Sequence, residues 1–127
     1  MNGHDAWMKF AHEDLKVAKL VWKEQLYNQV CFHAQQCVEK SFKALLVHRG
    51  QVPPKTHRLA TLISLVGSPK VQEFSSRVKL LDQIYIPTRY PDAIPGTLPE
   101  DVPNKAQAAD ALEMAQEIFE LVMEVVS

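Results

Sequence analysis

Residues 27–49, YNQVCFHAQQCVEKSFKALLVHR, decide the fold, because they form the longest uninterrupted helical pattern in the chain. At about 100° of rotation per residue, the apolar side chains of this stretch fall on one broad arc. The arc consists of Val30, Cys31, Ala34, Cys37, Val38, Phe42, Ala44 and Leu45. An apolar arc of this width predicts a helix that is buried against several partner helices.

The opposite side of the same predicted helix carries a polar ridge. Its members are Gln29, His33, Gln36, Lys40 and Lys43, which fall within a stripe roughly 80° wide. A histidine, two amides and two ammonium groups on one ridge can hold an anion. Lysine and glutamine are also good helix formers that face solvent by default, so an ordinary solvated face is the alternative.

The composition predicts one soluble domain spanning residues 1–127. The chain is 46% hydrophobic and 23% charged, and no apolar run reaches the roughly 18 residues that a membrane span needs. The N-terminus has no basic segment followed by an apolar one, so we expect a cytoplasmic protein without a membrane partner. A net charge of -1 argues against a surface built for nonspecific nucleic-acid binding and leaves room only for a local basic patch.

A first helix is predicted from a cap at Asp5 to about Gln25, with an apolar side. That side consists of Trp7, Phe10, Ala11, Leu15, Val17, Ala18, Val21 and Trp22. Asp14 projects from the middle of it, where an unpaired carboxylate is costly. Either Asp14 has a partner, such as a lysine or arginine from another helix, or it lies at a wet edge.

Two further helices are predicted in the middle of the chain. Thr56 is the expected cap of a short one over residues 57–66, which stops at Gly67. A longer one covers roughly residues 71–85 and carries Asp82 beside its apolar stripe, next to Tyr85.

Prolines recur every fourth residue from Pro87 to Pro103, which predicts a stiff extended loop over residues 85–103. Its early part holds Arg89, Tyr90 and Asp92 close together, and polar groups on a rigid loop are where sites tend to be built. Asn104 can cap a last helix. The predicted architecture is an all-α antiparallel four-helix up-and-down bundle with one extra short helix.

Several kinds of site lack support in the sequence. The four glycines are not clustered, so no phosphate-cradling loop is predicted. His12, His33, His48 and His57 lack the spacing and cysteine partners of a zinc site. Cys31 and Cys37 lie six residues apart on one helix, which excludes a mutual disulfide, and they are expected to be small buried hydrophobes. We therefore predict no metal and no cofactor.

Four segments together resemble the HEPN family, the "higher eukaryotes and prokaryotes nucleotide-binding" domain. They are EDLKVAKLV at 13–21, FHAQQCVEKSFKALLVHRG at 32–50, KTHRL at 55–59 and LDQIYIPTRYPD at 81–92, in the family's order. The resemblance implies a four-helix bundle with an extra short helix. It also implies a small stand-alone protein that is often dimeric and often accompanies a minimal nucleotidyltransferase, in some cases as a toxin–antitoxin pair.

Many HEPN proteins are metal-independent ribonucleases that use an arginine followed after four to six residues by a histidine. This chain departs from that pattern. Seven residues, including Pro53-Pro54, separate Arg49 from His57, and no histidine follows Arg58, Arg77 or Arg89. Nuclease activity is therefore not carried over from the family.

The resemblance implies a polar cleft for a nucleotide or a similar anion. Its expected members are His33, Gln36, Lys40, Lys43, His57, Tyr85, Arg89, Tyr90 and Asp92, supported by a polar network of Asp14, Glu39 and Asp82. The leading hypothesis is a non-catalytic HEPN protein that dimerises and binds a nucleotide or a nucleotidyltransferase partner, which in turn is able to modify Tyr85 or Tyr90. The alternatives are a divergent ribonuclease that uses His33 or His57 with Arg89 on an RNA ligand, and a purely structural bundle whose polar groups fix helix register.

Overall fold

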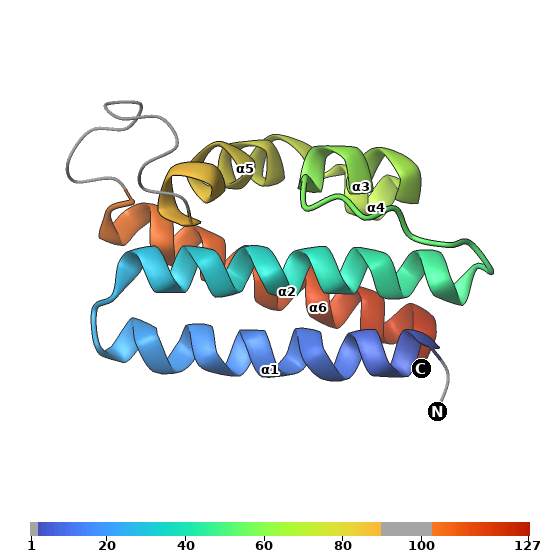
Figure 1. Cartoon of the computed structure of the whole chain (residues 1–127), viewed down its shortest axis with the longest axis horizontal. Helices are drawn as coiled ribbons and strands as arrows, with labels where there is room; N and C mark the ends of the chain where they lie inside the picture. The colour runs from blue at the N-terminus through green and yellow to red at the C-terminus, as the bar shows by residue number, and fades with distance from the viewer. Residues whose placement is uncertain (1–2, 90–102) are drawn as a thin grey trace.

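Helix α2 (Tyr27–His48) lies at the centre of the structure and packs against helices on several sides (Figure 1). The computed structural model describes residues 3–89 and 103–127, with the side chains of residues 85–89 left out. All eight side chains of the predicted apolar arc are buried, so the sequence interpretation of this helix is confirmed. Phe42 is among the largest fully buried side chains, with 0% of its surface exposed.

Three other long helices surround α2. They are α1 (Gly3–Lys23), α5 (Ser75–Arg89) and α6 (Lys105–Val126). The chain reverses direction between α1 and α2, between α2 and α5, and between α5 and α6, which gives the predicted antiparallel order (Figure 1). The all-α four-helix bundle is therefore confirmed, and the predicted extra short helix is α3 (Leu59–Val66). None of the helices in the described part of the chain is long and apolar enough to cross a membrane.

The predicted fourth helix is wrong in two respects. It is divided into α4 (Pro69–Gln72) and α5, because the amide of Phe74 bonds the carbonyl of Val71 in a tighter turn. Helix α5 also continues to Arg89, past the point where an extended loop was expected. Pro87 lies in the last turn of α5, where the helix lacks one hydrogen bond because proline has no amide hydrogen to donate.

Helices α6 and α3 are capped in different ways, α6 by residues at its own start and α3 by a side chain from another helix. Asn104 and Gln107 form a reciprocal capping box at the start of α6, with both hydrogen bonds at 2.9 Å, which confirms the predicted cap. Asp5 lies inside the first turn of α1 and is not its cap. Thr56 Oγ1 accepts from the amide of Arg58 but does not cap α3, whose first amides are bonded by a side chain from α5.

Both cysteines lie in the interior on α2. Cys31 and Cys37 are 1% and 0% exposed, as expected for small buried hydrophobes. Burial raises the pKa of each thiol to about 12. Neither side chain is therefore a reactive group in the folded chain.

Candidate functional site

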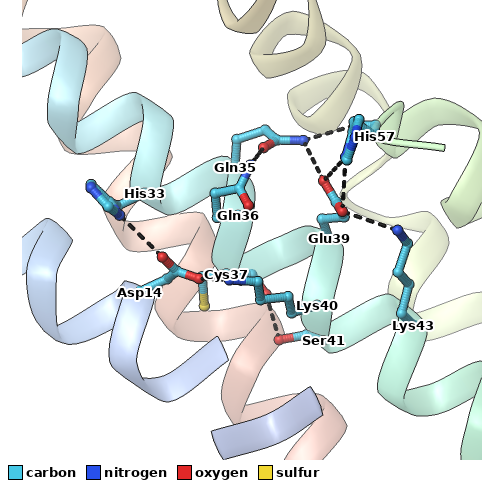
Figure 2. Close-up of polar contacts among 10 residues, drawn as sticks. All are labelled: Asp14, His33, Gln35, Gln36, Cys37, Glu39, Lys40, Ser41, Lys43 and His57. Atoms are coloured by element: carbon cyan, nitrogen blue, oxygen red, sulfur yellow. Dashed lines mark hydrogen bonds and ion pairs between the residues drawn. The ribbon is translucent and has the colours of Figure 1, made fainter. Parts of the chain in front are cut away.

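Asp14 on α1 is held between two side chains of α2 (Figure 2). Lys40 Nζ lies 2.5 Å from Asp14 Oδ2, and His33 Nδ1 lies 3.1 Å from Asp14 Oδ1. The expected partner of this carboxylate is thus Lys40, together with His33. Burial raises the pKa of Asp14, but the hydrogen bonds from His33 and Lys40 outweigh that effect and hold the pKa below its usual value.

Glu39 forms a second carboxylate centre on the other flank of α2 (Figure 2). Lys43 Nζ lies 3.0 Å from Glu39 Oε2, one helical turn along α2. His57, in the segment before α3, brings Nδ1 to 3.1 Å from Oε2 and 3.2 Å from Oε1. The side chain of Glu39 is 5% exposed, that of Lys43 7% and that of His57 55%, so a buried ion pair ends at an exposed imidazole.

Gln35 connects the second centre to the surface of α2, and sequence reasoning missed it. Its Nε2 donates to Glu39 Oε1 at 3.3 Å and to the carbonyl of His57 at 2.8 Å. Its Oε1 accepts from Gln36 Nε2 at 2.9 Å. Gln35 is 0% exposed, and its spacing of four residues from Glu39 is the signal that indicates such a pair.

Two predicted positions are corrected by the packing of α1. Lys43 does not lie on a solvated ridge, because the ring of Trp7 covers it with 5.5 Å between Nζ and the ring centroid. Phe10 is not in the core. It is 50% exposed, and its ring centroid lies 6.0 Å from Lys40 Nζ. The accessible edge of the site therefore combines an exposed aromatic ring with Lys40, Gln36 and His33.

The electrostatics of the site are balanced locally. The two ammonium groups of Lys40 and Lys43 each bond a carboxylate, from Asp14 and Glu39. With neutral imidazoles the cluster has no formal net charge. It presents hydrogen-bonding groups in fixed positions and does not present an excess of positive charge.

Asp82 plays a different role from the one expected. Its Oδ1 accepts from the amide of Leu59 at 2.8 Å and its Oδ2 from the amide of Ala60 at 2.9 Å. Asp82 therefore caps α3 from α5 and does not orient the lysines. Burial raises the pKa of Asp82, although the two backbone hydrogen bonds oppose that effect.

The remaining predicted residues are not brought together by the described structure. Tyr85 and Arg89 belong to the last turns of α5, and their side chains are outside the description. Tyr90 and Asp92 lie outside the described residues, so their roles stay predictions. In residues 3–84 and 103–127, no three His, Cys, Asp or Glu side chains are grouped to hold a metal ion.

Comparison with known proteins gives concordant matches in sequence and structure. A curated protein of Methanocaldococcus jannaschii, named "Putative toxin MJ1304", is 27% identical over 126 residues, which cover 91% of this chain and 83% of that protein. The crystal structure of TT1696 from Thermus thermophilus is 34% identical, with a TM-score of 0.80 over 98% of both chains. The crystal structure of ST0689, an archaeal HEPN homologue, is 28% identical, with a TM-score of 0.78 over 100% of both chains.

The match to the family description is equally extensive. The HEPN domain matches residues 4–125, which include all six helices apart from the ends of the first and the last. The chain therefore belongs to the HEPN domain family.

Proposed function

We propose that this chain is a non-catalytic HEPN protein that dimerises and binds a nucleotide or a nucleotidyltransferase partner, as one member of a toxin–antitoxin-like pair. The observation that carries the proposal is the pairing of Lys40 and Lys43 with carboxylates. Both ammonium groups are already occupied, so the cluster is poorly suited to stabilising new negative charge in a transition state. Its hydrogen-bonding groups in fixed positions support recognition of a ligand instead. The relative from Methanocaldococcus jannaschii that is named "Putative toxin MJ1304" supports this functional context.

The accessible edge of the cluster is the proposed contact surface. The side chains of Lys40 and His33 are 24% and 22% exposed, and Phe10 beside them is 50% exposed. Such an edge offers one aromatic face and several polar atoms. A planar ring or the polar side chains of a protein partner are able to engage both.

A thermal-shift titration with ATP and the other nucleoside triphosphates tests the nucleotide arm. At a hundredfold excess over the dissociation constant, mass action is expected to raise the melting temperature of the wild-type chain by about 8 °C. Lys40→Ala is expected to abolish the rise, because it removes the ammonium at the accessible edge and releases Asp14. Lys16→Ala, at an exposed position of α1, is the matched control and should keep the full shift.

The partner arm is tested by size-exclusion chromatography with a co-expressed minimal nucleotidyltransferase. A complex lost in Lys40→Ala but kept in Lys16→Ala supports the protein-binding form of the proposal. If the wild-type chain shows no melting-temperature shift with any nucleotide and forms no complex with the nucleotidyltransferase, the proposal is rejected. The structural interpretation of the cluster then remains.

The Glu39–His57 pair favours a second candidate, a divergent metal-independent ribonuclease. A buried carboxylate on Nδ1 fixes the ring of His57, and the side chain is half exposed, which is the arrangement of an oriented acid–base imidazole. Arg89 remains the predicted phosphate-binding partner of this candidate.

The ribonuclease candidate predicts cleavage of RNA in the presence of EDTA. Loss of cleavage of at least about 100-fold is expected in His57→Ala and in Arg89→Ala. His12→Ala, at an exposed position of α1, serves as the control for removal of an imidazole. Cleavage that survives His57→Ala, or that EDTA abolishes, would contradict this candidate.

A further inference from the structure

A cavity of about 220 Å³ lies between α5 and α6. The end of α5 lies near the start of α6 in the fold (Figure 1). Most of the cavity wall is apolar and consists of Leu80, Leu81 and Ile84 from α5 with Ala111 and Met114 from α6. Protein interiors rarely leave a gap of this size, because close packing fills most voids larger than a water molecule. The space between α5 and α6 is therefore a candidate binding site for a small molecule.

The cavity has a buried floor and an exposed rim. Met114 is 1% exposed at the floor, whereas Leu80 is 45% exposed at the rim. Two charged residues, Arg77 and Asp110, also line it, and the side chain of Asp110 is nearly half exposed. A ligand that fits this arrangement has an apolar body for the floor and a polar group for the mouth.

Arg77 is held in a fixed position at the mouth. Its Nη2 lies 2.9 Å from Asp110 Oδ1 and donates to the backbone carbonyl of Asp110 at 3.4 Å. Its Nη1 lies 3.5 Å from Glu117 Oε2, one turn further along the same face of α6. The guanidinium carbon lies 5.6 Å from the centroid of the Phe74 ring, in the range of a cation–π contact. The positive charge of Arg77 is thus shared between two carboxylates.

The mouth of the cavity is therefore negative. One guanidinium and two carboxylates together carry a formal net charge of -1. Within the described residues, Asp110 Oδ2 accepts from Arg77 Nε alone, at the long distance of 3.5 Å, so this oxygen keeps acceptor capacity for a ligand. Lys105, at the start of α6, places Nζ 6.0 Å from the centroid of the Trp22 ring and is directed toward α1.

We infer that the cavity between α5 and α6 binds a small organic cation, whose apolar body carries an amine. A cavity of about 150 Å³ holds benzene, so this one holds about nine heavy atoms. The apolar body contacts Leu81 and Met114, and the ammonium donates a hydrogen bond to Asp110 Oδ2 at the mouth. The site shares no residue with the clusters around Asp14 and Glu39, and its use does not depend on the function proposed above.

An NMR titration of the isotope-labelled chain with phenethylamine tests this site. The probe has the required size and is protonated at pH 7, as a lysine side chain is. Saturable binding is expected with a Kd of about 0.1–1 mM, with the largest amide shifts in residues 77–84 and 106–114. The uncharged analogue 2-phenylethanol should bind about fivefold more weakly. The anion phenylacetate should bind more weakly still, because it meets a mouth of its own sign.

Two variants separate charge from volume. Asp110→Asn is expected to weaken binding of phenethylamine about fivefold and to leave binding of 2-phenylethanol unchanged. Glu124→Gln, at an exposed position in the last turn of α6, removes the same charge and should change neither affinity. Ala111→Leu fills the cavity and should abolish binding of both probes, with a melting temperature equal to or above that of the wild-type chain.

Four outcomes would overturn the inference. The first is that no probe binds saturably, which would make the cavity a feature of packing alone. The second is that phenylacetate binds most tightly, which would give the ligand the opposite charge. The third is that Ala111→Leu keeps full affinity for phenethylamine, which would place the ligand elsewhere. The fourth is that Ala111→Leu dissociates a dimer of the wild-type chain in analytical ultracentrifugation, which would identify a second copy as the occupant.

Discussion

Replacement of Glu39 with glutamine is expected to lower the free energy of unfolding at pH 7 by about 3–5 kcal/mol. Glutamine has nearly the same shape, so the loss comes from charge. The ammonium of Lys43 is only 7% exposed, and without Glu39 it stays in the interior as an uncompensated cation. Urea denaturation followed by circular dichroism should show a midpoint about 2 M lower than that of the wild-type chain.

Two controls identify the cause. Glu113→Gln, at an exposed position of α6, removes the same charge and should change the free energy of unfolding by less than about 0.5 kcal/mol. Glu39→Met combined with Lys43→Met removes the whole pair and should be nearly neutral or stabilising, because no charge remains to be desolvated. If Glu39→Gln alone costs less than about 1 kcal/mol, the pair is more hydrated than its burial indicates.

Replacement of Phe42 with alanine is the other change with a large expected effect. The side chain is fully buried on the central helix, so truncation removes its hydrophobic transfer energy and leaves a cavity among several helices. We expect a loss of about 3–5 kcal/mol in the free energy of unfolding. Phe10→Ala is the matched control. It removes the same atoms from a ring that is 50% exposed and should cost about 1 kcal/mol or less in the same denaturation experiment.

These two phenylalanines show what periodicity is able to predict. The apolar arc of α2 was correct at every position, because helices cover the core face of α2 on several sides and a broad arc has to be buried. The arc of α1 placed Phe10 inside by the same arithmetic, but Phe10 lies at the rim toward Lys40. The rotation of an outer helix depends on its neighbours, and the spacing of its own residues does not determine it.

Some contacts of the candidate site could be predicted from the sequence and others could not. The need of Asp14 for a partner followed from its place in an apolar arc, and Lys40 satisfies it. The covering of Lys43 by Trp7 and the capping of α3 by Asp82 join residues that are far apart in the sequence, and no local pattern encodes such contacts. The capping box at Asn104 was predictable because its two residues are only three positions apart.

The placement of both cysteines on α2 makes the chain insensitive to its redox surroundings while it is folded. With a pKa of about 12, almost none of either thiol is ionised at neutral pH, and disulfide exchange proceeds through the thiolate. The Cys37 thiol also faces α6, where Sγ lies 3.9 Å from the carbonyl of Ala115. An alkylating reagent reaches these sulfurs only when α2 separates from its neighbours. The rate of cysteine labelling therefore measures how often the bundle opens.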